Sequence, residues 1–125
     1  MSVPVDENLC VDTKVSFISA KEVISKLIND HISFDGVFAN NDIMAMGAMQ
    51  ALRDNGIEIG KEVKIVGFDN ISLTEICSPP MTTISQDVVK LAQRSVDELL
   101  KLIQNQSKGG DVIVIPVELV KRQTT

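Results

Sequence analysis

Apolar residues recur along the chain with two different periods. Short apolar runs of strand length occupy residues 37–39, 63–68, 81–84, 112–115 and 117–120. Longer segments with apolar residues at helical spacing cover residues 16–30, 42–54 and 87–105. Strands that alternate with helices in this way predict an α/β chain that contains βαβ units.

Local signals predict where some of these elements begin and end. A capping box that starts at Ser19 predicts that the regular part of the first helix begins there. Asn55-Gly56 predicts a left-handed stop for the second helix. Pro116 separates the last two apolar runs and predicts an edge or a bend between them. Residues 1–14 are polar and irregular, so we expect a loop or a single edge strand there.

Polar residues follow two of the predicted strands directly. Asn40, Asn41 and Asp42 come after the first run, and Asp69-Asn70 come after the second. Because ligands of such folds bind at the carboxyl ends of the strands, these side chains predict a hydrogen-bonding site for a small polar molecule. The same residue types also cap helices and form Asx-turns. The pattern leaves both interpretations open, although one of the first three residues is expected to cap the helix.

Composition argues against several classes of function. The net charge of −5 and the absence of Trp and Tyr argue against a nucleic-acid-binding surface within these 125 residues. No apolar run is long enough to span a bilayer, and the N-terminus lacks the features of a secretory signal. Cys10 and Cys77 are isolated, which predicts free thiols in a cytoplasmic protein.

The sequence shows no motif of catalysis. Gly109-Gly110 follows a helix instead of preceding one, and no Ser lies in a nucleophile elbow. His31 is the single histidine, and neither Asp42 nor Asp69 has a nucleophile or metal partner beside it. We therefore expect a protein that is not an enzyme and that has no cofactor or metal.

Several segments together carry a resemblance to a known family. In chain order they are Phe38–Ala48, Gly56, Val66–Asn70, Pro79–Gln86 and Leu119–Arg122. They resemble the C-terminal part of the effector-binding core of LacI/GalR transcriptional regulators, and the stretch from Ser95 to Arg122 is especially similar to the lactose-repressor branch. The resemblance implies a Rossmann-like parallel sheet flanked by helices, in the type I periplasmic-binding-protein-like arrangement.

The resemblance also implies roles for single residues. The family's ligand-contacting residues match Asn41, Asp69 and Gln86. A carboxylate accepts bonds from sugar hydroxyls, whereas amides both donate and accept. Asp42 matches the neighbour of the family's Asn and is expected mainly to cap the helix. The family's aromatic contact aligns with Val15, so stacking on a sugar would have to come from Phe17.

Homodimerisation is a further implication of the resemblance. The family's dimer face corresponds to Met46, Ile76 and Cys77. For the neighbouring Met44 and Met49, we favour simple core packing.

The family's two-lobed core implies three segments in this chain. Residues 1–81 would form the C-terminal lobe, 82–106 a strand and helix that return to the N-terminal lobe, and 107–125 the closing strands and tail. The family's helix-turn-helix and most of its first lobe have no counterpart here. We therefore expect part of a longer protein, which alone binds sugar poorly, exposes apolar surface and reaches operator DNA only through the missing segment.

Two functions are compatible with these implications. The favoured one is the sugar-binding and dimerisation region of a bacterial regulator, in which the effector changes the angle between the lobes. The alternative is a periplasmic sugar-binding protein of an ABC transporter, which resembles this fold and shares the Asn, Asp and Gln positions. The proline-rich and Lys-Arg signatures favour the regulator.

Overall fold

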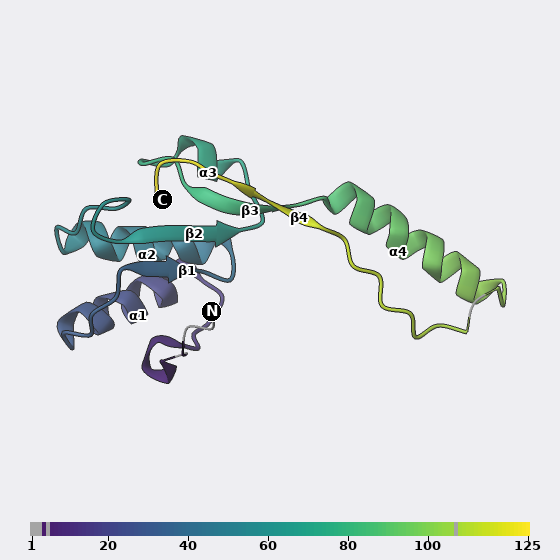
Figure 1. The fold of residues 1–125 in the computed structure, drawn as a ribbon, viewed down its shortest axis with the longest axis horizontal. Coiled ribbons are helices and arrows are strands. Elements are labelled where there is room, and N and C mark those ends of the chain that lie inside the picture. The colour runs from purple at the N-terminus through teal and green to yellow at the C-terminus, as the bar shows by residue number, and fades with distance from the viewer. Residues whose placement is uncertain (1–3, 5, 107) are drawn as a thin grey trace.

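The computed structural model describes residues 4, 6–106 and 108–125, and it shows a body of sheet and helices from which one long helix projects (Figure 1). The elements in chain order are the 3-10 turn η1 Glu7–Leu9, α1 Phe17–Asn29, β1 Gly36–Phe38, α2 Asp42–Asp54, β2 Lys64–Phe68, α3 Leu73–Ile76, β3 Thr82–Gln86, α4 Val88–Ile103 and β4 Val117–Val120. This alternation of strands and helices confirms the α/β prediction.

The strands form one sheet in the order β1-β2-β3-β4. Strands β1, β2 and β3 are parallel, whereas β4 pairs antiparallel with β3 from Thr83–Val120 to Gln86–Val117. The prediction of a further strand at residues 112–115 is wrong, because that segment is irregular and ordered pairing begins only after Pro116. A proline has no N–H for a ladder, which suits its place just before an edge strand.

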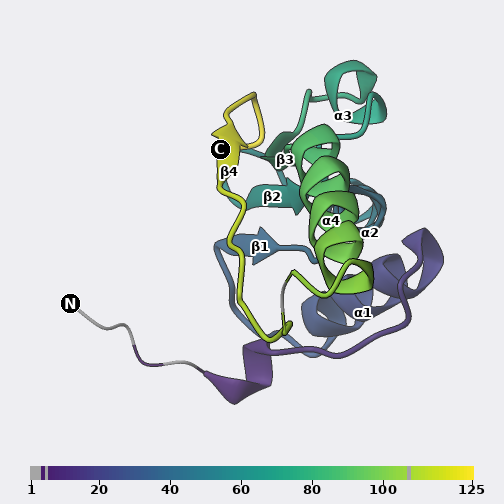
Figure 2. The ribbon, with the colours of Figure 1, turned by 90° about the vertical axis from the view of Figure 1, so that its right-hand side faces the viewer.

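Helices α1 and α2 pack on one side of the sheet, and α2 contacts both α1 and β2 (Figure 2). Val37 and Ile65 are cross-strand partners and point to the helices. Because side chains alternate along a strand, Phe38, the residue after Val37 in β1, points away from the helices. Phe38 is 67% exposed, which shows that the second face of the sheet lies open at this strand. The buried core therefore lies between the helices and one face of the sheet, around Met49, Leu52, Ile65 and Met81.

The first helix begins earlier than its capping box predicts. Ser16 has an extended backbone, and its hydroxyl accepts a hydrogen bond from the Ser19 backbone N–H at 3.1 Å. Ser16 is thus the N-cap, and the predicted start at Ser19 is wrong by one turn. At the end of α2, Gly56 has a φ of 72°, so the predicted left-handed stop is confirmed.

Helix α4 projects from the body and has no buried residue (Figure 1). Strand β3 pairs with β2 from Val66–Thr82 to Phe68–Ile84, so it belongs to the body's sheet. Helix α4 is therefore the element that leaves the body after β3. Among the described residues, no helix combines the length and the apolarity that crossing a membrane requires.

Candidate ligand-binding site

The sheet brings three of the predicted ligand residues to the side where its parallel strands have their carboxyl ends, and this side is called the edge below. Asn41 follows β1, Asp69 follows β2 directly, and Gln86 is the last residue of β3. Because these three neighbouring strands are parallel, their carboxyl ends share the same edge of the sheet. The edge therefore offers one carboxylate and two amides.

Asp69 and Gln86 contact each other directly. The Gln86 Nε2 donates a hydrogen bond to Asp69 Oδ1 at 2.7 Å. Asp69 is exposed, whereas Gln86 is half-buried. Asp69 and Asn70 have φ values of 107° and 56°, a region that residues other than glycine rarely adopt. Such a conformation costs about 1–3 kcal/mol and persists where surrounding contacts hold it, which is a recurrent property of binding sites.

Asn41 is the N-cap of α2. Its Oδ1 accepts a hydrogen bond from the Met44 backbone N–H at 2.8 Å. The expectation that one residue of the polar triplet caps the helix is therefore confirmed. Because the cap uses the amide oxygen, the Nδ2 amino group is the part of Asn41 best able to donate to a ligand. Asn40 instead lines an apolar cavity of about 220 Å³ between α1, β1 and the N-terminal segment.

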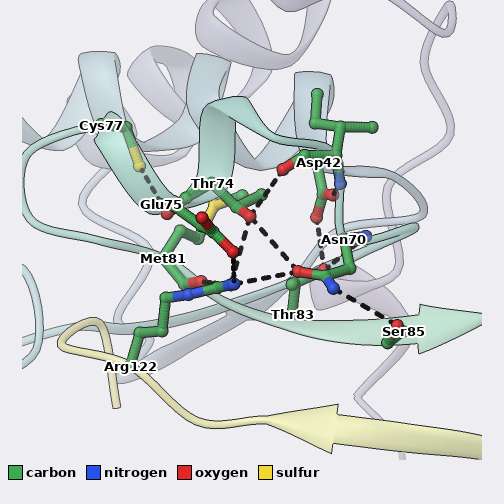
Figure 3. Close-up of polar contacts among 10 residues, drawn as sticks. Asp42, Asn70, Thr74, Glu75, Cys77, Met81, Thr83, Ser85 and Arg122 are labelled. Atoms are coloured by element: carbon green, nitrogen blue, oxygen red, sulfur yellow. Dashed lines mark hydrogen bonds and ion pairs between the residues drawn. The ribbon is translucent and has the colours of Figure 1, made fainter.

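Asp42 does not have the role expected for it. Its side chain is buried, with an exposed fraction of 1%. Oδ1 accepts from Thr83 Oγ1 at 2.5 Å, and Oδ2 accepts from the Ile71 backbone N–H at 2.9 Å (Figure 3). Asp42 thus connects the start of α2 to β3 and to the turn after Asp69. It is neither the helix cap nor a group exposed to ligand.

Phe17 is the first residue of α1, where it lines a surface groove whose other lining residues all belong to α1 or its C-cap. Neither Asp69 nor Gln86 lines that groove. The structure therefore gives no support for stacking by Phe17 beside these two residues.

The predicted dimer residues have different surroundings. Ile76 ends α3 and is 78% exposed, whereas Met46 is half-buried and packs against the core. The Cys77 thiol donates to the carbonyl oxygens of Thr74 and Pro79 at 3.4 and 3.3 Å. The expected core packing of Met49 is confirmed by its complete burial, and Met44 also packs against the core.

One residue of this region was not singled out from the sequence. The guanidinium of Arg122 donates hydrogen bonds to Asn70, Thr74, Glu75 and Met81 (Figure 3). Asn70 is the residue that follows Asp69 in the sequence. The sequence carried only a weak signal for this role, because Arg122 simply follows a short apolar run and Lys121.

Charged groups with shifted pKa values lie away from this edge. Hydrogen bonding by Lys21 lowers the pKa of Asp54, hydrogen bonding by Lys101 lowers the pKa of Glu98, and hydrogen bonding by Glu58 raises the pKa of Lys61. Within the described part of the chain, no three His, Cys, Asp or Glu side chains gather closely enough to hold a metal ion. The edge itself offers the Asp69 carboxylate and the Asn41 and Gln86 amides as hydrogen-bonding groups.

Residues 6–125 match the model of a family described as the periplasmic binding protein-like domain. The chain is 37% identical over 123 residues to the HTH-type transcriptional regulator DegA of Bacillus subtilis, covering 98% of this chain and 36% of that protein. It is 39% identical over 110 residues to the lactose operon repressor of Escherichia coli, covering 88% of this chain and 30% of that protein.

Solved structures show the same relationship. The Lac repressor bound to ONPG superposes with a TM-score of 0.82 at 39% identity, covering 88% of this chain and 33% of that one. A LacI family transcriptional regulator from Enterococcus faecium with bound ribose gives a TM-score of 0.75 at 34% identity, covering 90% and 42%. The chain spans about a third of the length of the curated relatives it matches.

Proposed function

The chain belongs to the periplasmic binding protein-like domain family, in the form that LacI-type regulators carry, and from this we propose that it is the effector-binding and dimerisation region of a bacterial transcription regulator. The observation that carries the proposal is the meeting of Asn41, Asp69 and Gln86 at one edge of a parallel sheet. The named relatives are regulators and repressors, which favours this function over a transporter's periplasmic protein.

The proposed effector is a sugar. The exposed Asp69 carboxylate can accept hydrogen bonds from two neighbouring hydroxyls, and Gln86 Nε2 already points at that carboxylate. A sugar hydroxyl placed between them would accept from Gln86 while it donates to Asp69. Ribose and lactose are bound in two solved LacI family regulators that resemble this chain, which supports the sugar class without selecting one sugar.

The remaining parts of the proposal concern the longer protein. Residues 1–81 would form one lobe. Residues 82–106 would return to a second lobe, into which α4 would pack, and residues 107–125 would supply the closing strands and tail. Met46, Ile76 and Cys77 would face the partner subunit of a homodimer. Effector binding between the lobes would then shift the population of conformations that bind operator DNA. Because bacterial operator DNA lies in the cytoplasm, the proposed location of the protein is the cytoplasm.

Asp69→Ala in the full-length regulator tests the ligand site. Calorimetry with ribose, lactose and ONPG as probes should find one that binds the unmodified protein. The variant should bind that probe about ten- to a hundredfold more weakly, because a hydrogen bond to a charged group contributes about 1.5–3 kcal/mol.

Asp35→Ala is the matched control, because Asp35 is an exposed carboxyl residue just before the amino end of β1, the opposite edge of the sheet. It should leave the affinity unchanged. Equal affinities for the Asp69 variant and the unmodified protein would refute the ligand site.

A further inference from the structure

Arg122 joins parts of the body that are far apart in the sequence. It follows β4, and its backbone N–H donates to Thr82 Oγ1 at 2.9 Å. The next residues are anchored as well, since the Gln123 N–H donates to the Pro80 carbonyl and Thr124 bonds to Ile65. Hydrogen bonds therefore hold the backbone at Arg122 in place, and only 14% of the Arg122 side chain is exposed.

One nitrogen of the guanidinium reaches the turn that carries Asp69. Nη2 donates to Asn70 Oδ1 at 3.0 Å, and Asn70 Nδ2 donates in turn to Ser85 Oγ at 3.3 Å (Figure 3). Asn70 has a positive φ, as does Asp69 before it. Its side chain is thus held from both sides, and this restrains the backbone conformation that places the Asp69 carboxylate at the sheet edge.

The same guanidinium also holds α3. Nη1 donates to Thr74 Oγ1 at 3.1 Å and to the Met81 carbonyl at 2.9 Å, and Nη2 contacts Glu75 Oε1 at 3.2 Å. Thr74 is fully buried, so this contact lies inside the body. A planar fork of donors can satisfy these acceptors together, whereas the single ammonium of a lysine cannot.

We propose that Arg122 is a positioning residue, which holds the Asp69–Asn70 turn in its ligand-binding conformation and links that turn to α3. The link to ligand rests on the proposed function; the restraint of the turn does not. Because α3 leads directly into Cys77, Arg122 connects the predicted effector contact to the predicted subunit contact at Ile76 and Cys77. A ligand on Asp69 would thereby change the stability of α3.

The ligand-free test is amide hydrogen exchange in the full-length protein, comparing Arg122→Gln and Arg122→Lys with the unmodified protein. The Ile71 amide reports on the turn, the Cys77 amide on α3, and the Ala20 amide on α1 as a reference. Both variants should speed exchange at Ile71 and Cys77 by about tenfold or more. Exchange requires local opening, and this opening costs less free energy when there are no guanidinium contacts to break. Exchange at Ala20 should stay unchanged.

Lys121→Gln is the control, because Lys121 is an exposed cation beside Arg122. It should leave all of these rates unchanged. Equal acceleration at Ile71, Cys77 and Ala20 would show only a general loss of stability and would overturn the proposal, as would no acceleration in the Arg122 variants.

The ligand arm uses whichever of ribose, lactose or ONPG binds the unmodified protein. That sugar should slow exchange at both Ile71 and Cys77 in the unmodified protein. In Arg122→Lys it should slow exchange at Ile71 but not at Cys77, because the connection to α3 is cut. Slowing of both amides in the variant would overturn the link. If no probe binds the unmodified protein, the sugar function fails, while the ligand-free arm still decides the positioning role.

Discussion

At the scale of single residues, Asp42 shows how one buried carboxylate can connect the segments that follow two strands of the sheet. It is buried, and its two oxygens accept from a β3 hydroxyl and from the backbone of the turn after Asp69. A buried carboxylate without partners would be very unfavourable, so these two donors and the carboxylate depend on each other. The conformation of the turn at Asp69 is therefore tied to the start of α2.

Thr83→Val tests this dependence. The substitution removes the donor to Asp42 Oδ1 but keeps the branched shape of the side chain. It should lower the free energy of unfolding by about 1–3 kcal/mol, because a buried acceptor loses its partner. Urea denaturation measures the change. Thr13→Val, at the apolar cavity under α1, is the control and should change stability little.

Gly47→Ala should reverse the usual effect of replacing a helix glycine. In an exposed helix, alanine is favoured over glycine by about 1 kcal/mol. Here an added Cβ would lie 2.3 Å from the Phe17 carbonyl oxygen, so α1 and α2 would have to move apart. Thermal unfolding should show a lower melting temperature than that of the unmodified protein. An Arg53→Ala control on the exposed side of α2 should show little change, and a stabilised Gly47 variant would disprove the close packing.

At the scale of elements, α1 and α2 form a unit that close backbone contact and one ion pair hold together. Lys21 Nζ lies 2.6 Å from Asp54 Oδ2, at the surface between the two helices. The hydrogen bond from Lys21, followed by that from Gln50, lowers the pKa of the Asp54 carboxyl. Both groups are well exposed, so solvent and salt screen this pair and its contribution to stability is small.

The pH dependence of this pair has a definite sign. Because the pKa of Asp54 is lower in the folded state, its contribution is present above the ordinary Asp value of about 3.9 and is lost as the pH falls through the lower folded value. Asp54→Asn should therefore reduce stability slightly near neutral pH and flatten its decline below about pH 4. Urea midpoints measured against pH for both proteins would show this. Identical pH profiles would contradict it.

At the scale of the whole molecule, the chain consists of a packed body and of helix α4, which has no buried residue. Helix α4 carries apolar side chains that remain exposed, among them Val96, Leu99 and Ile103, and the segment that returns to β4 exposes Val112 and Val114. So many exposed large apolar side chains favour contact with another surface. The proposed second lobe would provide that surface in the longer protein.

The 125-residue chain alone should consequently self-associate. Sedimentation velocity should show an average mass that rises with concentration, because α4 of one copy can cover apolar surface of another. Leu99→Gln together with Ile103→Gln should reduce this association without lowering the melting temperature, since neither residue is buried in the body. A Gln93→Ala control on the polar face should associate as before. A monomer at every concentration would refute the prediction.

Sequence alone determined the order of the three long helices and of β1, β2, β3 and β4, because such elements follow from periodicities within a few residues of each other. It did not identify the four-residue helix α3, and it predicted a strand at residues 112–115 that the structure lacks. It also determined the stop of α2 at Asn55-Gly56 and the placement of polar residues after β1 and β2, which are local properties too. The resemblance of whole motifs then pointed to the family, and the match over residues 6–125 confirmed it.

Only the tertiary structure decided which polar residue does what. Asn41 caps the helix and Asp42 is buried, a division that depends on contacts of Asp42 with Ile71 and Thr83, which are 29 and 41 positions away. Arg122 reaches Asn70 across 52 positions. No local pattern records such contacts, because they exist only after the strands have paired. The sequence could therefore name the residues of this edge, whereas packing assigned their roles.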